Sequence, residues 1–579
     1  MATFNLSSIA FESKTENNLL NEEIEQISFG EVSEYKIKLK FKDEVSPSPY
    51  TLSWKVPQID FFAFWSPKTC FDQALIPDWA MRKCDSKTAS GMPVACIYNK
   101  KNQNRFLIAL SDPAIPSLIE AGVVEEDGTI LVKTMLFSQH CQKMSEYEVT
   151  LRIDRRCIPF YNAVTDTRDW WSSLGFNSAY IPESAKDPLY SAWYSFHQRT
   201  IPDEIVYECS IAKDFGIKTL IVDDGWQTAD GSRGYAYCGD WEICSDKIPD
   251  MKDFVDRIHA LGMKFMIWFS VPFVGFYSKN YERFKGKYLY ARNNVKASVL
   301  DPRFKEVRDF LVEIYADYVT KYGWDGLKLD FIDSFSLTDE SSTDFESMDT
   351  VSLEEGVERL ISEISARLKS INPDFLIEFR QSYVGPIMGR YGNMFRVTDC
   401  PNDALTQRKF ALDLRLTSDK IPVHSDMLMW NKDETNEAVM YQLLATLFCV
   451  PQISIRFDSI TNEHKALLKN YLNFWCEHRD TILSGKLEAH GAQANYTMAI
   501  STNNRESVAA LYENVVISPK ENVNYIFNST GNDYIYADLK AEALCQCFDL
   551  FGNEASSLKL DKGAHRLNVP NCGMVKITY

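Results

Sequence analysis

The pattern of apolar and polar residues changes twice along the chain. Up to about residue 180, short runs alternate with a period of two, as in residues 35–41 and 147–153. This period is typical of strands that bury one face. Turn-forming residues such as the Ser-Pro-Ser-Pro segment at 46–49 separate the runs. We therefore predict that residues 1–180 form a large β-sandwich domain.

Residues 181–482 show a different pattern, in which strand-like apolar runs alternate with amphipathic runs of helical length. The expected strands are 191–195, 219–223, 264–270, 326–331, 375–379, 394–399, 421–427 and 452–455. The expected helices are 203–215, 252–261, 305–322, 353–371, 403–414, 434–448 and 462–477. This alternation predicts an α/β fold, a central (β/α)8 TIM barrel. An open doubly wound sheet is the alternative, but no glycine-rich phosphate turn follows the first strand.

The last part of the chain, residues 483–579, returns to short β runs. They are 496–500, 507–512, 523–527, 545–550 and 574–579. We expect a small antiparallel β-domain here, after the barrel.

Composition and charge exclude several classes of protein. The formal net charge of −18 disfavours nucleic acid and anionic membranes as partners. The first residues lack the basic and apolar regions of a signal peptide, and the apolar stretch 263–277 is too short to span a bilayer. The 14 cysteines form no CxxC pair and HExxH is absent, so we expect reduced core thiols and no metal site. These features predict a cytoplasmic protein.

Acidic and basic residues gather where the predicted barrel strands end. Active-site residues of such barrels stand at the carboxyl ends of strands. The ends carry Asp223-Asp224-Gly225-Trp226, Trp268, Lys328-Leu329-Asp330, Glu378-Phe379-Arg380, Arg396-Val397-Thr398-Asp399 and His424-Ser425-Asp426. Carboxylates and a lysine can hold sugar hydroxyls, and a tryptophan can cover the apolar face of a pyranose. The strand ends thus favour a sugar site.

Asp330 is the first candidate for chemistry. Because side chains alternate along a strand, Lys328 and Asp330 share a face, the barrel interior. A neighbouring ammonium favours the ionised carboxylate that a nucleophile needs, although a structural ion pair is the alternative. Asp399, two strands away, could supply the second carboxyl of a retaining glycosidase. Helix capping is its alternative role, which Asp403 fits better.

The remaining strand ends allow more than one interpretation. Asp223 and Asp224 could bind two neighbouring hydroxyls or a metal, or could serve the Asp-Gly turn. His424 and Asp426 would share a face and could support the site or supply its acid/base, and a satisfied core histidine is the commoner outcome for His424.

An ordered set of segments resembles the α-galactosidases of glycoside hydrolase family 36, which share a clan with family 27. The matching segments are 193–195, 220–226, 239–241, 261–269 and 328–331. That family has a β-supersandwich, a barrel and a small β-domain in this order. The resemblance implies that Asp330 is the nucleophile and that no cofactor is needed. It also implies a sugar-binding set: Asp223, Asp224, Trp226, Asp240, Trp241, Trp268, Lys328 and Arg396, with Asp399 as acid/base.

The turn after the fifth strand departs from the family. Many members carry a Cys/Gly-rich turn there, and this chain has Phe379-Arg380-Gln381-Ser382-Tyr383. Since that turn lies near position two of the sugar, we add Arg380 to the substrate-binding set and leave the substituent at that position open.

These observations predict a retaining exo-α-galactosidase that acts on terminal α-linked galactose of an oligosaccharide. An α-N-acetylgalactosaminidase or an α-galactosyl transglycosylase on the same site is the alternative, and a non-catalytic sugar-binding protein is a third. The oligomeric state stays open, a homo-oligomer included.

Overall fold

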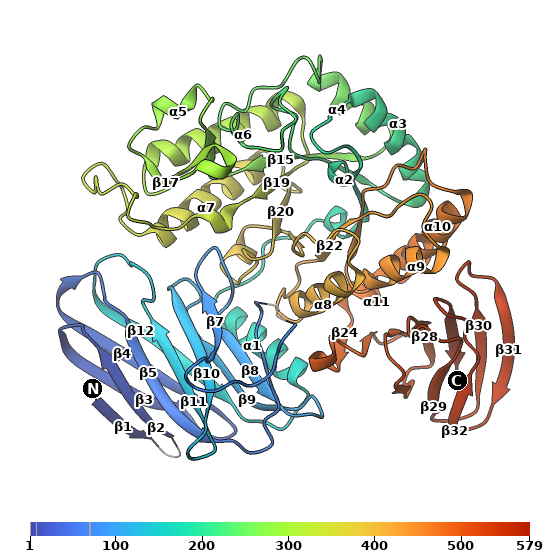
Figure 1. Cartoon of the computed structure of the whole chain (residues 1–579), viewed down its shortest axis with the longest axis horizontal. Helices are drawn as coiled ribbons and strands as arrows, with labels where there is room; N and C mark the ends of the chain where they lie inside the picture. Colours follow the sequence, from blue (N-terminus) through green and yellow to red (C-terminus); the bar gives the residue numbers. More distant parts are fainter. Residues whose placement is uncertain (1, 7–8, 69–70) are drawn as a thin grey trace.

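A central barrel with a β-rich region on either side makes up the molecule (Figure 1). The computed structural model describes residues 2–6, 9–68 and 71–579. The amino-terminal region contains two six-stranded sheets, with strand orders β1-β2-β5-β11-β10-β7 and β3-β4-β12-β9-β8-β6. Their strands are β1 (Ala2–Leu6), β2 (Ile9–Thr15), β3 (Leu19–Ser28), β4 (Val32–Val45), β5 (Tyr50–Pro57), β6 (Ala63–Trp65), β7 (Arg82–Ser86), β8 (Val94–Tyr98), β9 (Asn104–Leu110), β10 (Ser117–Val124), β11 (Thr129–Leu136) and β12 (Met144–Asp154).

The alternating runs that predicted the sandwich pair with each other. Residues 35–41 lie in β4 and residues 147–153 in β12, and the two strands are antiparallel, with Ile37 opposite Val149. Tyr35, Ile37 and Leu39 are buried on one face of β4. The period of two therefore arises because one face packs into the sandwich core.

The interpretation of residues 1–180 as β throughout is wrong for one segment. Helix α1 (Phe160–Ser173) follows the last strand of the sandwich. It buries Phe160, Val164 and Trp171 at helical spacing, and the Trp171 indole donates to the Leu110 carbonyl oxygen at 2.9 Å. This helix fastens the sandwich to the chain that enters the barrel.

The central barrel is closed, with eight parallel strands in sequence order, as predicted. Its strands are β13 (Leu189–Ser191), β14 (Thr219–Val222), β15 (Lys264–Ser270), β19 (Gly326–Asp330), β20 (Leu376–Arg380), β21 (Met394–Arg396), β22 (Val423–Leu428) and β23 (Val450–Ile453). Its helices include α2 (Trp193–Phe196), α3 (Pro202–Ala212), α4 (Met251–Ala260), α6 (Lys305–Tyr322), α7 (Leu353–Ile371), α8 (Ala404–Arg415), α9 (Asn436–Ala445), α10 (Asn462–Glu477) and α11 (Arg479–Ser484). Helices α6, α7 and α10 match the predicted ranges residue for residue.

The first barrel strand differs from its predicted range of 191–195. It ends at Ser191, and the following residues form the short helix α2. The backbone N–H groups of Tyr194 and Ser195 donate to the Ser454 hydroxyl at 3.0 and 3.1 Å. Because these donors are used by a side chain, they do not extend the strand ladder.

A small sheet stands at the carboxyl end of β15. Strands β16 (Phe273–Gly275), β17 (Tyr288–Arg292) and β18 (Ala297–Leu300) form it in the order β16-β18-β17, with helix α5 (Asn280–Arg283) between the first two. It lies in the long connection from β15 to α6, so it builds up one side of the barrel mouth.

The carboxyl-terminal region is a two-sheet β-domain. A seven-stranded sheet has the order β24-β25-β26-β28-β33-β30-β31, and a three-stranded sheet has the order β27-β29-β32. Most pairs are antiparallel, as predicted, while β26–β28 and β27–β29 are parallel. The strands are β24 (Lys486–His490), β25 (Met498–Thr502), β26 (Ser507–Leu511), β27 (Val516–Ile517), β28 (Val523–Asn528), β29 (Ile535–Leu539), β30 (Ala543–Phe548), β31 (Glu554–Leu560), β32 (Gly563–Leu567) and β33 (Met574–Thr578).

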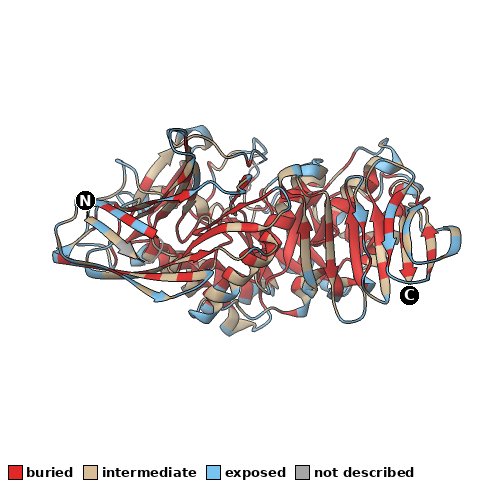
Figure 2. Cartoon of the chain, turned by 90° about the horizontal axis from the view of Figure 1, so that it is seen from below, coloured by how far each residue is buried: buried red, intermediate tan, exposed pale blue. Residues whose placement is uncertain are grey.

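All three regions share buried contacts. One hydrophobic core contains Trp65 and Tyr98 of the sandwich, the barrel residues, and Tyr512 and Phe527 of the last domain. Figure 2 shows buried residues along the whole length of the molecule. A polar contact reinforces this junction, because Asp413 of α8 accepts hydrogen bonds from the Trp65 indole at 2.7 Å and from the Tyr496 hydroxyl.

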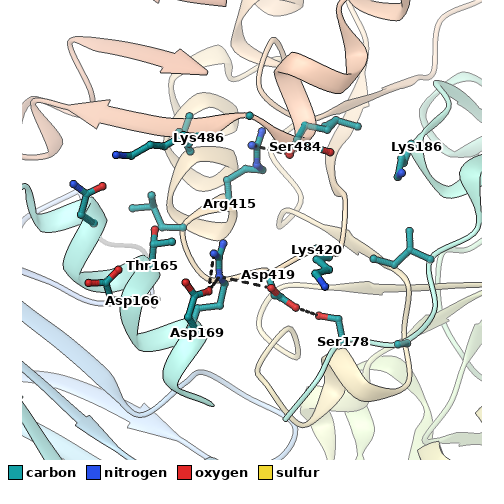
Figure 3. A pocket seen from close by; sticks show the side chains of 18 of the residues that line it. Thr165, Asp166, Asp169, Ser178, Lys186, Arg415, Asp419, Lys420, Ser484 and Lys486 are labelled. Carbon is teal, nitrogen blue, oxygen red and sulfur yellow. Dashed lines mark hydrogen bonds and ion pairs between the residues drawn. The ribbon is translucent and has the colours of Figure 1, made fainter. Parts of the chain in front are cut away.

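A cavity of about 1040 Å³ lies where α1, the barrel and the last domain meet (Figure 3). Residues 178–181 and Lys186, which precede β13, and Asp419 and Lys420, which precede β22, line part of it. In the wall of this cavity, the Ser178 hydroxyl donates a hydrogen bond to Asp419 Oδ2 at 2.6 Å. Since these residues come before their strands, the cavity lies at the amino end of the barrel, away from the carboxyl ends of the strands.

Two findings bear on the expected class of protein. Among the described residues, the cysteines are free thiols, most of them buried, and the expectation of a core position is wrong for the exposed Cys157 and Cys476. Within the same residues, no helix has both the length and the apolar character needed to cross a membrane.

Candidate active site

Asp330 is the last residue of β19 and lies inside the barrel mouth. Its Oδ1 accepts hydrogen bonds from Arg380 Nε at 2.6 Å, from the Phe331 backbone N–H at 2.7 Å and from the Tyr383 hydroxyl at 3.2 Å. Its Oδ2 accepts one, from Trp268 Nε1 at 3.0 Å. Phe331 has a φ of 64°, which turns the chain away directly after the strand. The carboxylate is thereby held at the strand end.

The surroundings of Asp330 keep its carboxylate charged. Burial would raise the pKa of Asp330, but the positive charges of Arg380, Lys328 and Arg396 outweigh burial. They hold the pKa well below the usual range of an aspartate. Asp330 is therefore ionised at neutral pH, as a carboxylate nucleophile must be.

Lys328 shares the barrel interior with Asp330, as the strand pattern predicted. It is 4% exposed, and its Nζ lies 2.6 Å from Asp223 Oδ2. Burial would lower the pKa of Lys328, but the negative charges of Asp223, Asp330 and Glu378 together outweigh burial and keep the pKa raised. Lys328 thus bridges the ends of β14 and β19 as a buried cation.

Asp224 follows Asp223 just beyond the end of β14, and the two side chains take different partners. Asp224 accepts hydrogen bonds from Gln198 Nε2 at 2.6 Å and from Gln227 Nε2 at 2.7 Å. Burial raises the pKa of Asp224 to about 6. Neither glutamine could be found from the sequence, because both act through a contact formed only in the fold.

Arg396, at the end of β21, is surrounded by three acids. Its Nη2 donates to Asp399 Oδ1 at 2.9 Å and its Nη1 to Asp426 Oδ1 at 2.6 Å, while its Nε lies 3.6 Å from Glu378 Oε1. Arg396 is 1% exposed, whereas the Asp399 side chain is 61% exposed. Arg396 therefore places a carboxylate at the open side of the mouth.

The residues around Asp399 hold its carboxylate in the charged form. Desolvation by the surrounding residues would raise the pKa of Asp399, but the positive charges of Arg396, Lys328 and Arg380 together outweigh it and lower the pKa. Asp403, the competing carboxylate, caps α8, since it accepts a hydrogen bond from the Thr406 backbone N–H at 3.0 Å. The predicted capping role of Asp403 is confirmed, and Asp399 is the carboxylate at the mouth.

Asp426 and His424 take the supporting roles that were weighed for them. Asp426 accepts hydrogen bonds from the Tyr194 hydroxyl at 2.9 Å and the Cys400 backbone N–H at 2.6 Å. It thereby holds the segment that carries Asp399. His424 is fully buried, with Nε2 2.8 Å from the Ala185 carbonyl oxygen, and burial lowers its pKa to about 4. His424 is a neutral core histidine.

The aromatic residues expected around the sugar divide into two groups. Trp268 reaches Asp330, and its ring stacks on Tyr235 with centroids 6.1 Å apart. Trp226 is fully buried, donates to the Trp268 carbonyl oxygen at 2.9 Å and stacks on Trp241. Trp226 and Trp241 thus lie behind Trp268, as packing that supports it. Trp268 is also buried, and its hydrogen bond to Asp330 distinguishes it from the other two.

Two further candidates, Asp240 and Arg380, form hydrogen bonds within the protein. The Asp240 carboxylate accepts hydrogen bonds from the Ser278 hydroxyl and from the backbone N–H groups of Lys279 and Asn280, so it orders the loop before α5. Arg380, placed by sequence in the substrate-binding set, donates to Asp330 and to the Gln381 carbonyl oxygen. Both residues are thus fixed by protein partners, and their contact with a substrate stays a prediction.

The sandwich domain also reaches this end of the barrel. Lys87 Nζ donates to the Phe335 carbonyl oxygen at 2.8 Å, and the Ser90 hydroxyl donates to the Ser382 hydroxyl at 3.1 Å. These contacts brace the turns after β19 and β20. Over the residues that the structure describes, no group of three His, Cys, Asp or Glu side chains is arranged to hold a metal ion.

A closed parallel barrel with carboxylates and cations at its strand ends defines the class: a barrel protein with a polar site for chemistry at the carboxyl face. Comparison with known proteins then narrows this class. The Melibiase family model matches residues 187–382, about a third of the chain. That segment includes the ends of β14, β15, β19 and β20.

Curated relatives match a part of the chain. The α-galactosidase Mel36A of Lactobacillus acidophilus is 29% identical over 133 residues, which cover 21% of this chain and 16% of the relative. The bifunctional α-galactosidase/sucrose kinase AgaSK of Mediterraneibacter gnavus is 30% identical over 133 residues, which cover 21% of this chain and 14% of the relative. These alignments therefore span less than a fifth of either relative.

Solved structures match almost the whole fold. A variant of the family 36 α-galactosidase AgaA of Geobacillus stearothermophilus, bound to 1-deoxygalactonojirimycin, has a TM-score of 0.67 and 14% identity, covering 95% of this chain and 79% of that one. The α-galactosidase of Lactobacillus brevis has a TM-score of 0.67 and 13% identity, covering 98% and 84%. The predicted resemblance to the glycoside hydrolase family 36 α-galactosidases is confirmed by these matches.

Proposed function

We propose that this protein is a retaining exo-α-galactosidase that removes terminal α-linked galactose from oligosaccharides. One observation carries the proposal: an ionised, immobilised Asp330 and an exposed Asp399 stand at the ends of β19 and β21, with the cations Arg380, Lys328 and Arg396 around them. Retaining glycosidases need such a pair, one carboxylate as nucleophile and one carboxyl as acid and base.

In the proposed mechanism, Asp330 attacks the anomeric carbon while Asp399 gives its proton to the leaving oxygen. Asp399, now ionised, then takes a proton from the water that cleaves the glycosyl ester. Asp399 must be protonated for the first step, and its pairing with Arg396 opposes this. A bound sugar excludes water from the mouth, and desolvation raises the pKa of a carboxyl group. We infer that sugar binding raises the pKa of Asp399, so that Asp399 takes up the proton it donates.

The proposed sugar contacts come from the residues that reach the mouth. Asp223 and Lys328 form a buried pair that can hold adjacent hydroxyls, and the Trp268 ring lies beside the nucleophile. Solved structures of AgaA variants contain raffinose and stachyose, which supports an α-galactoside as substrate. An α-N-acetylgalactosaminidase or a transglycosylase is the second candidate. The reason is that residues 379–383, which include Arg380, stand where many family members have a Cys/Gly-rich turn near position two of the sugar.

The decisive experiment combines a substrate panel with trapping of the intermediate. Aryl α-galactoside and aryl α-N-acetylgalactosaminide are compared at one enzyme concentration, and a mechanism-based fluorosugar then labels the nucleophile. We expect turnover of the galactoside, release of the α-anomer first, and a label on Asp330. A first product of β configuration, a label elsewhere, or sugar binding without turnover of any glycoside contradicts the proposal.

We also propose a cytoplasmic location and an oligosaccharide as the partner in solution. The free state of the described cysteines supports the first, since thiols stay reduced in the cytoplasm. Localisation of a tagged chain in its source cells tests it, and secretion into the medium would overturn it.

A further inference from the structure

We propose that Arg380 is a positioning residue that leaves Asp330 Oδ2 as the attacking oxygen and stabilises the Asp330 carboxylate when it departs in the second step. This inference rests on the proposed function and deepens it. It changes the role of Arg380 from contact with the sugar to control of the nucleophile.

The two oxygens of Asp330 have different hydrogen-bond loads. Oδ1 accepts from three donors: Arg380 Nε at 2.6 Å, the Phe331 N–H at 2.7 Å and the Tyr383 hydroxyl at 3.2 Å. Oδ2 accepts only from Trp268 among the described residues. A carboxylate has about two acceptor sites on each oxygen, so Oδ1 is saturated. Oδ2 keeps a lone pair for the anomeric carbon.

Arg380 is itself fixed in place. Its Nη1 donates to the Gln381 carbonyl oxygen at 2.8 Å and lies 3.6 Å from Asp333 Oδ2. Its guanidinium lies over the rings of Phe331 and Tyr383, 5.3 and 5.5 Å from their centroids. A guanidinium does not lose its proton in a protein, so this charge is constant over any assay pH. Arg380 therefore holds Oδ1 by a rigid, permanent charge.

A permanent charge at Oδ1 affects the two chemical steps in opposite directions. In the first step the Oδ2–C1 bond forms, the bond from C1 to the leaving oxygen breaks, and that oxygen takes the proton of Asp399. The negative charge of Asp330 is consumed, which Arg380 opposes. In the second step water oxygen bonds to C1, its proton goes to Asp399, and the C1–Oδ2 electron pair returns to Asp330. Arg380 favours this return of charge.

Removal of Arg380 should therefore slow the second step more than the first. With an aryl α-galactoside that has a good leaving group, we expect Arg380→Ala to lower kcat on the order of 100-fold. We expect KM to fall as well, so that kcat/KM changes less than about tenfold. A burst of aryl alcohol and a glycosyl adduct in the intact mass should accompany the change, and added guanidinium ion should restore part of kcat.

Matched variants separate position from charge. Arg380→Lys keeps the charge but loses the planar donor, so kcat should again fall more than kcat/KM, by a smaller factor. This variant provides the test if Arg380→Ala does not fold. Tyr383→Phe removes the 3.2 Å donor and keeps the ring, and a weak split is expected. Arg390→Ala is the control, because Arg390 is 41% exposed and pairs with Glu358 on the barrel surface. It should leave kcat and KM unchanged.

The failures of the two proposals are distinguishable. If the wild type hydrolyses no aryl α-galactoside, the proposed function is wrong and this inference falls with it. If the wild type is active, but kcat and kcat/KM of folded Arg380→Ala and Arg380→Lys fall equally without a burst, only this inference is overturned. Unchanged kcat in both variants overturns it as well.

Discussion

Asp330 and Asp413 are both buried aspartates next to cations, yet the structure uses them differently. Asp330 ends a barrel strand, is 8% exposed and keeps one oxygen with room for a reacting atom. Asp413 lies on α8, is 1% exposed, and is enclosed by the Trp65 indole, the Tyr496 hydroxyl and Lys409 at 3.8 Å. Burial and pairing alone thus do not identify a catalytic residue. Position at the end of a barrel strand, at the mouth of the barrel, does.

The cations at the two places also differ in how many acids they serve. Arg380 lies near Asp330 and Asp333, and Lys328 pairs with Asp223. Lys409, which is fully buried, has Asp413 as its ion-pair partner, and no other is found for it among the described residues. Loss of the Asp330 carboxylate therefore leaves Arg380 near Asp333, whereas loss of the Asp413 carboxylate leaves Lys409 without its ion-pair partner.

The largest expected effect comes from one substitution made at both places. Asp330→Asn should lower turnover on the order of 1000-fold or more, because an amide is not a nucleophile. Asp413→Asn keeps an acceptor oxygen but leaves the buried Lys409 ammonium without a negative partner. This should lower the free energy of unfolding by about 3–5 kcal/mol. Turnover per folded molecule should hardly change. Urea unfolding and an aryl α-galactoside assay on both variants measure the contrast.

A surface pair provides the control for this contrast. Asp309 pairs with Lys305 on α6, and its side chain is 54% exposed. Asp309→Asn should change the free energy of unfolding by less than about 1 kcal/mol. The distinction between the two regions would be lost if Asp330→Asn lowered stability as much as Asp413→Asn. It would also be lost if the Asp413→Asn protein had wild-type stability.

The sequence predicted the barrel well and the site only in part. Apolar runs such as 264–270 and amphipathic runs such as 305–322 determine their elements locally, and both matched the structure. Helix α1 was missed because its valine, threonines and tryptophans also favour strands. Local pattern thus identifies an element best where period and residue preference agree.

Side-chain direction could not be derived from the same pattern. Trp226 follows an Asp-Gly turn whether its ring faces the mouth or the core, and only the packing against Trp241 decides. Tyr194 supports Asp426 from a position 232 residues away in the chain. Arg380 was assigned to the sugar because its strand-end position was visible and its bond to Asp330 was not. Contacts between strands remote in sequence account for each of these.

A third buried aspartate gives a smaller, pH-dependent test. The pKa of Asp224 is raised to about 6, from 3.8 for the unfolded chain, by burial. The folded state therefore binds more protons between pH 4 and 6, and this residue's contribution to stability falls as pH rises through that window. A shift of this size corresponds to about 3 kcal/mol.

Asp224→Asn removes this dependence. The free energy of unfolding of the wild type minus that of the variant is measured by urea titration at pH 4, 5, 6 and 7. This difference should decrease as pH rises, because only the wild type loses the Asp224 contribution. Other titrating groups are common to both proteins and cancel in the difference. A difference that stays constant across this range would mean that the Asp224 carboxyl titrates normally.

The last contrast, in which only a small change in stability is expected, separates Asp399 from Asp403, four residues apart. Asp403 caps α8 through the Thr406 backbone N–H, so Asp403→Ala should cost about 1 kcal/mol of stability and leave turnover unchanged. Asp399→Ala should lose most hydrolysis of galactosides with poor leaving groups, because those depend on proton donation, and lose less with activated aryl substrates. Both variants are assayed on the two substrate types and melted side by side. If instead Asp403→Ala lost turnover of the poor substrate and Asp399→Ala kept it, the capping carboxylate would be the acid, and α8 would have to release Asp403 during the reaction.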